Sequence, residues 1–168
     1  MQLLRQLVVI AFAMNLSEGT AALFANANAA TTCTVTLPNG SSPPGVGSDH
    51  QWYGNDKLRV GLYWPNGTVV FRPGGPGFVL RNGSLAMKFG WWRGVNGKLS
   101  INGKRLDAPA PPLQAWIPEG YSDSGFEATE IIFPTPGCWQ VTGTVGQSSL
   151  SFVTRVVQIG SRKSDSWR

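Results

Sequence analysis

Apolar and polar residues alternate along much of the chain from residue 57 onward, and this two-residue period is typical of a β-strand with one buried face. In the first such run, one face carries Leu58, Val60, Leu62 and Trp64. The pattern predicts further strands at residues 68–71, 84–92, 98–101, 126–133, 138–145 and 149–157, with a short strand after residue 103. None of these runs has the 3.6-residue period of a helix, so we predict an all-β fold.

Asn-Gly pairs separate several of these runs, at Asn66-Gly67, Asn82-Gly83, Asn96-Gly97 and Asn102-Gly103. Both residues of such a pair tolerate the positive φ angles of a tight turn, so each pair predicts a hairpin. The prolines between Pro109 and Pro112 interrupt strand pairing, as at a crossing between sheets or at a sheet edge. Short strands with turns at this spacing favour an antiparallel β-sandwich.

The N-terminal segment has the layout of a secretory signal. Arg5 precedes an apolar run at residues 7–14 that is too short to span a bilayer, and Ala27-Asn28-Ala29 supplies the small residues of a cleavage site. We therefore predict a signal peptide at residues 1–30 and export of the chain. Two alternatives are an earlier cleavage near residue 13 and a true start at Met14, without export.

The remainder of the chain divides into three parts. Residues 31–56 are dense in Pro and Gly and are predicted to be an irregular leader. The alternating runs predict a β-sandwich domain at residues 57–160, and the polar residues 161–168 a frayed tail. No stretch after the signal approaches the roughly 20 apolar residues of a membrane helix, so we expect no transmembrane segment in the mature chain.

The chain has two cysteines, Cys33 and Cys138. Export would place them in an oxidising compartment, where a disulfide persists. Such a bond would close a loop for which chain-entropy estimates give about 4–5 kcal/mol. Two alternatives are a pair of unbonded buried thiols and a lipid anchor on Cys33, since residues 30–33 are similar to a lipoprotein cleavage site that lacks its usual Leu.

Composition agrees with short strands joined by turns, because charged residues make up only 14% of the chain while it contains 21 Gly and 12 Pro. The net charge of +5 arises from Lys and Arg that are scattered singly rather than gathered in one stripe. We therefore expect no nucleic-acid partner.

Several motifs together are similar to a known group of sequences: PNGS at 38–41, WPNGTVV at 64–70, MKFGWWRG at 87–94, RLDAPAPPL at 105–113 and GCWQVTG at 137–143. They resemble uncharacterised exported bacterial proteins over most of the mature chain. The last motif also resembles the closing strands of bacterial immunoglobulin-like domains. The resemblance implies an immunoglobulin-like sandwich and an exported location, and it implies no catalytic residues.

Residue types that carry chemistry are sparse. His50 is the single histidine, so a blue-copper site lacks its second His, and no Cys-x-x-Cys is present. We predict no catalytic residue, no metal site and no cofactor. A pair of carboxylates for glycoside hydrolysis would come from Asp49, Asp56, Asp107, Glu119, Asp123, Glu127 and Glu130, a signal that most β-proteins offer.

The seven tryptophans are more informative. In a strand, Trp91 and Trp92 point to opposite faces, so one ring enters the core while its neighbour lies on the outer face or against another segment. Trp52 presents the same choice. An exposed ring beside polar donors stacks on sugars or anchors a protein partner. The candidate ligand surface is therefore Trp52, Trp91, Trp92 and Arg93, and the alternative is that the rings are buried.

These observations favour a non-catalytic exported domain that acts in binding or assembly at the cell envelope, with an envelope protein or a polysaccharide as its partner. The alternative is a hydrolase of envelope or extracellular polymers that uses an acidic pair. An enzyme would gather carboxylates or His50 in a cleft, whereas a binding module would expose a strip of aromatic rings. A purely structural domain would show neither.

Overall fold

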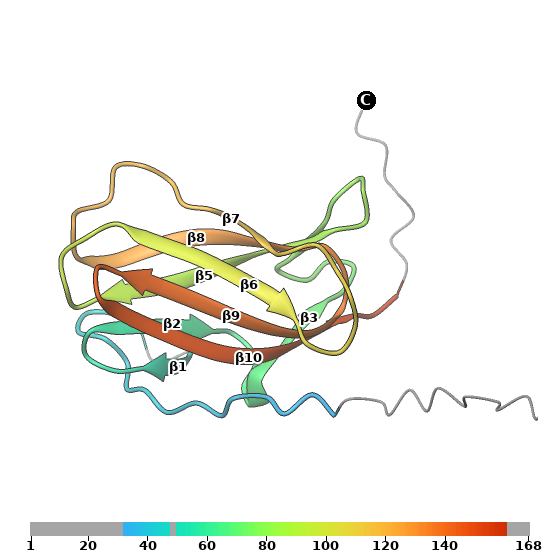
Figure 1. The fold of residues 1–168 in the computed structure, drawn as a ribbon, viewed down its shortest axis with the longest axis horizontal. Coiled ribbons are helices and arrows are strands. Elements are labelled where there is room, and N and C mark those ends of the chain that lie inside the picture. The colour runs from blue at the N-terminus through green and yellow to red at the C-terminus, as the bar shows by residue number, and fades with distance from the viewer. Residues whose placement is uncertain (1–31, 48–49, 161–168) are drawn as a thin grey trace, which may run out of the picture.

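The computed structural model describes residues 32–47 and 50–160 (Figure 1). The predicted signal peptide at residues 1–30 and the predicted tail at residues 161–168 lie outside the described residues. Within the described part, no helix is long and apolar enough to cross a membrane.

The described residues form two β-sheets that face each other across a common core (Figure 1). Sheet A has the spatial order β1 (Gln51–Gly54), β2 (Leu58–Leu62), β5 (Leu85–Arg93), β8 (Gly125–Phe133) and β7 (Gln114–Trp116), and β4 (Phe78–Val79) also pairs with β5. Sheet B has the order β3 (Thr68–Phe71), β10 (Ser148–Gln158), β9 (Gly137–Val145) and β6 (Leu99–Arg105). The predicted all-β class is confirmed.

Strand pairing in the described part is antiparallel except between β3 and β10, which run parallel. The chain changes sheet between β2 and β3, β3 and β4, β5 and β6, β6 and β7, and β8 and β9. The Pro109–Pro112 segment lies in the connection between β6 and β7, so the predicted crossing between sheets is confirmed. Each sheet thus combines strands from distant parts of the sequence.

The core lies between the inner faces of the two sheets, as the alternation predicted. Sheet A contributes Val60, Phe89, Trp91, Ile131 and Phe133, and sheet B contributes Trp139, Val141, Phe152 and Val156, all of them almost completely buried. Burial of such side chains stabilises a fold by about 1.5–3 kcal/mol each. The ring of Trp139 also donates a hydrogen bond from Nε1 to the carbonyl oxygen of Thr135, 3.0 Å away.

The Asn-Gly pairs do not all form hairpins. Asn82-Gly83 connects the antiparallel strands β4 and β5, and the Gly83 N–H donates to the Leu80 carbonyl oxygen over 2.9 Å. At Asn66-Gly67 both residues have the expected positive φ, 58° and 60°, yet they form the turn η1 (Pro65–Gly67) between the two sheets. The positive φ angles are therefore as predicted, but the turn connects two sheets and does not form a hairpin.

The hairpin predicted at Asn102-Gly103 is wrong. Both residues lie inside β6, where they are opposite Thr142 and Val141 of β9. Continuous pairing with β9 overrides the local turn preference, because each paired residue gains ladder contacts that a turn would lose. The prediction at Asn96-Gly97 is also wrong, since this pair connects β5 of sheet A with β6 of sheet B.

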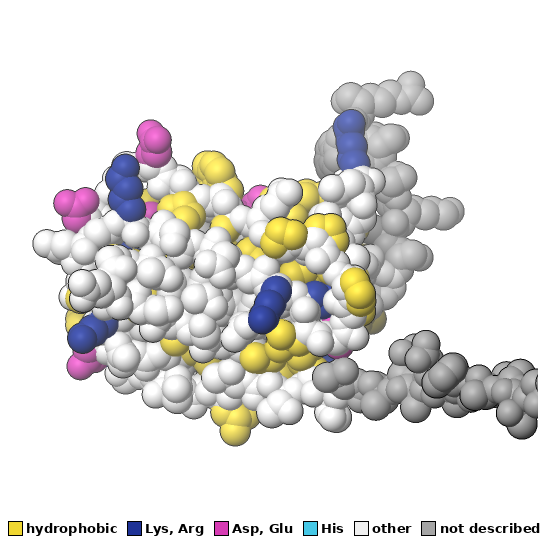
Figure 2. All heavy atoms as spheres, in the orientation of Figure 1, with side chains coloured by type: hydrophobic (Ala, Val, Ile, Leu, Met, Phe, Trp, Pro, Cys, Tyr) yellow, Lys and Arg dark blue, Asp and Glu magenta, His cyan; other side chains and the backbone are white. Residues whose placement is uncertain are grey.

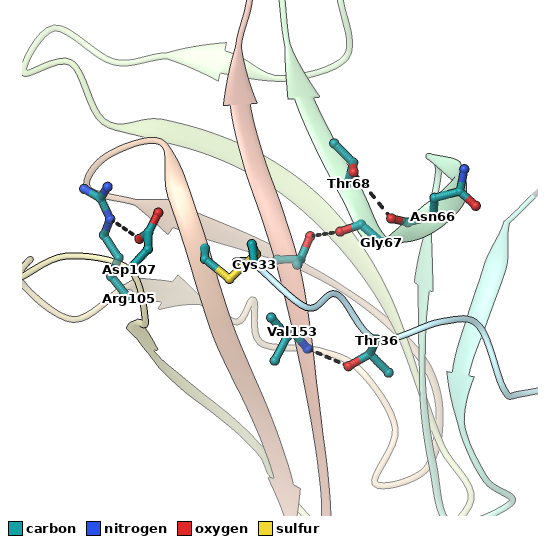
Figure 3. Close-up of a disulfide and its surroundings, with 10 residues drawn as sticks. Cys33, Thr36, Asn66, Gly67, Thr68, Arg105, Asp107 and Val153 are labelled. Carbon is teal, nitrogen blue, oxygen red and sulfur yellow. Dashed lines mark hydrogen bonds and ion pairs between the residues drawn. A yellow bond between two sulfur atoms is a disulfide. The ribbon is translucent and has the colours of Figure 1, made fainter. Parts of the chain in front are cut away.

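The segment predicted as an irregular leader has more order than expected. It contains β1, which pairs with β2, and Gly40 forms an isolated bridge to Trp52. Thr36 satisfies the open edge of β10, where its N–H donates to the Val153 carbonyl oxygen and its hydroxyl accepts from the Val153 N–H, both over 2.9 Å (Figure 3). The leader therefore contacts both sheets.

A disulfide joins Cys33 of this leader to Cys138 of β9, with 5.4 Å between the Cα atoms (Figure 3). The predicted bond is present, and the alternative of two free thiols is not observed. Near the bond, Arg105 Nε donates to Asp107 Oδ1 over 2.7 Å. This hydrogen bond is the main reason that the pKa of the Asp107 carboxyl lies below its ordinary value.

Candidate functional site

The four predicted surface residues have different environments. Trp91 is 0% exposed and Trp52 is 3% exposed, while Trp92 is half-buried on the opposite face of β5 from Trp91. The predicted division of the Trp91-Trp92 pair between core and outer face is thus observed. Arg93 is 3% exposed, so Trp92 is the one member of the set that offers a ring to solvent.

Trp52 is buried although it lies on the outer side of sheet A. Its partner in the β1–β2 register is Gly61, and its ring lies over Gly61, where a Cβ atom would come within 3.2 Å of the indole. Gly40 pairs with the Trp52 backbone at the edge of β1. In this arrangement, the ring packs against the sheet and cannot stack on a ligand.

Sheet A nevertheless has an aromatic outer face, formed by Trp92, Phe126 and Trp116. Trp92 of β5 is opposite Phe126 of β8 in the register, so the two side chains project from the same face. Trp116 of β7 is opposite Glu130 in the register. Glu130 follows Phe126 by four residues in β8 and therefore lies on the same face. Phe126 is 42% exposed and Trp116 is 61% exposed.

The three rings form two separate aromatic stations on this face. The first station consists of Trp92 and Phe126, and the second consists of Trp116. Phe126 and Glu130 are four residues apart, which corresponds to about 13 Å along an extended strand. The second station continues from Trp116 through Glu130 to Lys88, its partner on β5. A ligand that spans both stations must therefore be extended.

The residues between the stations are small. Gly61, Gly90 and Ala128 occupy the row between them, in register across β2, β5 and β8. The ring edge of Phe126 lies over Gly90, where an added Cβ atom would come within 2.8 Å of the ring. Small residues thus let the rings of Trp52 and Phe126 lie close to the sheet.

The outer face of sheet B has a different character. Its rows carry Ser100, Thr144 and Ser149, then Asn102, Thr142 and Ser151. Thr142 and Ser151 share a hydrogen bond of 2.7 Å between their hydroxyl oxygens. Figure 2, which looks onto β6, β9 and β10, shows few charged or apolar side chains at the centre of this face. The outer face of sheet A therefore carries aromatic rings, whereas the described outer face of sheet B carries small polar side chains.

A cleft of about 550 Å³ opens at one end of the sandwich. We call it the end cleft, and its lining includes Arg93, Lys98, Leu99, Ile117, Pro118, Glu119, Gly120, Tyr121, Asp123 and Glu127. Three of the seven carboxylates considered from the sequence thus line one cleft. Glu119 and Asp123 lie in the segment before β8, and Glu127 lies in β8 itself.

Arg93 holds the wall of this cleft in place. Its Nη1 donates to the carbonyl oxygens of Gly97, at 2.7 Å, and Asp123, at 3.2 Å, and Nη2 donates to the Ser122 carbonyl oxygen. Its Nε lies 3.0 Å from Glu127 Oε2 in an ion pair that is almost fully buried. Arg93 therefore joins the loop after β5 to the loop before β8.

The other acidic residues have separate environments. Asp56 contacts Arg59 and is 95% exposed, and Asp107 pairs with Arg105. Glu130 lies on the outer face of β8, opposite Lys88, and Asp49 lies outside the described residues. The His50 ring lies beside the Tyr63 ring, with the centroids 4.0 Å apart and the planes tilted by 50°. In the described part, no group of three His, Cys, Asp or Glu side chains is arranged to hold a metal ion.

Phe126 and Trp116 are the residues of the aromatic outer face that sequence reasoning missed. Phe126 was counted within the strand at 126–133, and its position two residues before an outward-facing Ala128 was the available signal. Glu127, which the sequence offered among the candidate carboxylates, is 4% exposed on the inner face of β8. The segment around Trp116 gave no period long enough to predict a strand.

No protein-family model matches this chain, and neither a curated protein nor a solved structure is significantly similar to it.

Proposed function

We propose that this chain is a non-catalytic binding domain of the cell envelope and that the aromatic outer face of sheet A is its ligand surface. The observation that carries the proposal is the exposure of Trp116 and Phe126 on the same face as Trp92. Apolar rings of this size normally find a buried place or a partner. Here the core is already filled by other rings of the same sheet.

The chemistry of this face favours a polysaccharide as the ligand. Sugar rings present flat C–H faces that stack on aromatic side chains, while their hydroxyl groups bond to nearby polar side chains. Lys88 and Glu130 lie in the row of Trp116 and supply such groups. Because the Phe126 ring lies close to the sheet over Gly90, this face suits a flat, extended chain more than the protruding side chains of a protein partner.

Binding to insoluble polysaccharides tests the proposal. Retention should be selective for particular polymers, and Trp116→Ala or Phe126→Ala should each weaken it by about threefold to tenfold, the range expected for loss of one ring contact. Ile159→Ala is a matched control, because Ile159 is 57% exposed beyond β10 of sheet B. Equal loss with the control, or binding only to an envelope protein, would contradict a polysaccharide surface on sheet A.

We further propose that the chain is exported through its N-terminal signal and that the sandwich is immunoglobulin-like. Support for the fold comes from two largely antiparallel sheets joined by repeated sheet crossings, and the disulfide suits an oxidising compartment. Mass spectrometry of the exported protein should find an N-terminus near residue 30 or 31. A product that still begins at Met1 or Met14 would contradict cleavage there.

The end cleft favours one second candidate, a hydrolase of extracellular polymers. The observation is that Glu119, Asp123 and Glu127 share its lining. Release of soluble fragments from a retained polymer, abolished by Glu127→Gln and unchanged by Trp116→Ala, would favour this activity over binding alone.

A further inference from the structure

We propose that the polysaccharide held by the aromatic outer face is a glycan of acetamido sugars, and that the backbone N–H of Ala128 donates to the acetamido carbonyl oxygen. This inference rests on the proposed function, because it places the ligand on the two aromatic stations. The observation that carries it is a stretch of open strand edge on β8, at Phe126 and Ala128, between the stations.

The ladders on either side of β5 show which way the backbone groups of β8 point. Gly94, which follows β5, donates its N–H to the Lys57 carbonyl oxygen next to β2 over 3.0 Å. Hydrogen-bonded pairs recur at every second residue of an antiparallel ladder, so even-numbered residues in this part of β5 bond to β2 and odd-numbered ones to β8. The register places odd-numbered residues of β8 opposite them. The N–H and C=O groups of Phe126 and Ala128 therefore point away from β5, toward the side on which β7 lies.

The strand β7 covers this side of β8 only in part. Its pairing with β8 ends at Trp116, opposite Glu130, and the next hydrogen-bonded pair in the same register would place Pro118 opposite Ala128. Proline has no N–H group, so it cannot continue the ladder in full. Among the described residues, no carbonyl oxygen of the segment after β7 accepts from the Ala128 N–H, and Ala128 is only half-buried. One backbone donor is thus open between the two stations.

The height of the aromatic rings selects the group that can reach this donor. The Phe126 ring lies over Gly90, and a sugar stacked on that ring would lie a further contact layer of about 3.5–4 Å above it. The Ala128 N–H lies in the plane of the sheet, and a hydrogen bond spans only about 2.9 Å. A hydroxyl oxygen, which is bonded directly to the sugar ring, stays too far away. An acetamido group carries its carbonyl oxygen further from the ring and can reach down past the strand edge.

A peptide strand is the other class of ligand that offers amide carbonyl oxygens. The open edge is short, because β7 occupies it from Glu130 onward and β8 begins at Gly125. Strand addition derives its affinity from a row of main-chain hydrogen bonds, whereas one acetamido group needs a single donor. The aromatic stations on both sides of Ala128 also favour a ligand that stacks on rings.

Two tetrasaccharides with the same β-linked backbone test the inference, one of N-acetylglucosamine and one of glucose, each titrated into the full chain and followed by NMR. The N-acetylglucosamine tetramer should shift the Ala128 amide resonance saturably and bind about threefold to tenfold more tightly, the range for one added hydrogen bond. The Thr129 amide, which faces β5, is the internal control and should shift much less.

The outcomes separate this inference from the proposed function. Equal affinity for the two tetramers, with the Trp116 indole resonance shifting in both titrations, would overturn the acetamido assignment and leave the polysaccharide surface intact. No binding of either tetramer would also overturn the assignment, and absence of retention on every insoluble polysaccharide would overturn the proposed function as well. Tighter binding of acetyl-trialanine amide at the Ala128 amide would identify a peptide strand as the ligand and overturn the proposal.

Ala128→Pro removes the proposed donor alone. Proline is tolerated where the N–H of a strand residue faces an open edge, so the ladder between β5 and β8 should persist. The affinity for the N-acetylglucosamine tetramer should fall to that for the glucose tetramer, which should not change. Trp116→Ala is the matched comparison, because loss of a stacking ring should weaken both tetramers by the same factor. If Ala128→Pro fails to fold, the amide shifts of the wild-type protein decide the question.

Discussion

Gly143 of β9 has no side chain because the Trp91 ring occupies the space that one would need. A Cβ atom built at Gly143 overlaps Cζ3 of the indole. The same principle operates on the outer face, where Gly90 accommodates the Phe126 ring. At the scale of single residues, the positions of the large rings therefore depend on small residues in neighbouring strands.

Gly143→Ala should lower the free energy of unfolding by about 1–3 kcal/mol, because one added methyl group overpacks a filled core. Urea denaturation followed by tryptophan fluorescence measures the change. Trp91→Phe made in the same chain should recover part of the loss, since the smaller ring leaves room for the methyl group. Strict additivity of the two substitutions would contradict a direct clash.

Asp107→Asn should lower the free energy of unfolding at neutral pH by up to about 1 kcal/mol, the range for partly exposed ion pairs. The pKa of Asp107 is lower in the folded state than its ordinary value, chiefly through the hydrogen bond from Arg105. Its contribution is therefore present above about pH 4 and is lost as the pH falls through the folded-state pKa. Urea midpoints of both proteins from pH 7 to pH 2 should converge at the acid end; a constant difference would contradict the linkage.

At the scale of elements, the leader acts as an additional edge partner for the sheets. Thr36 covers one residue of β10, and Asn39 accepts a hydrogen bond from the Gly54 N–H through its Oδ1 atom over 2.9 Å. Thr36 also packs against Gly67, where a Cβ atom would come within 2.9 Å of the Thr36 carbonyl oxygen. These contacts satisfy backbone groups that an open strand edge would leave unpaired.

Thr36→Val should show how much the leader contributes to stability. It removes the acceptor of the Val153 N–H while keeping the shape of the side chain. We expect a loss of about 1–2 kcal/mol in the free energy of unfolding and faster hydrogen exchange at the Val153 amide. Thr34→Val is the matched control, since Thr34 is exposed in the same segment. Unchanged exchange at Val153 would contradict a structural role for the Thr36 hydroxyl.

At the scale of the whole molecule, one covalent bond joins the leader to the start of β9, the first strand of the chain's last hairpin. Cys33 and Cys138 are 105 residues apart, so the bond encloses all strands of sheet A together with β3 and β6 of sheet B. A cross-link over such a loop restricts the unfolded chain more than a local bond does. The disulfide is therefore expected to stabilise the molecule as a unit rather than one strand.

Replacing both cysteines by alanine should lower the free energy of unfolding by about 4–5 kcal/mol, according to the chain-entropy model. Chemical denaturation of the variant and of the reduced wild-type protein should give the same midpoint. A midpoint equal to that of the oxidised protein would contradict a stabilising role for the bond.

The sequence by itself determined where the main strands run and which of their side chains face inward. In β9 and β10, for example, Trp139, Val141, Phe152 and Val156 are buried as their alternation predicted. This part is local, because the two-residue period of a strand fixes the phase of its side chains without reference to any partner. The all-β class follows from the same property.

The tertiary structure alone decided which strands are neighbours, because alternation fixes a phase and carries no information about the partner. Pairing with β9 placed Asn102-Gly103 inside a strand, and the register of β5 with β8 brought Phe126 beside Trp92. The end cleft arose in the same way, since Arg93 and Glu127 meet only through the pairing of β5 with β8. Both candidate sites are therefore products of strand order, while the side chains that form them were visible in the sequence.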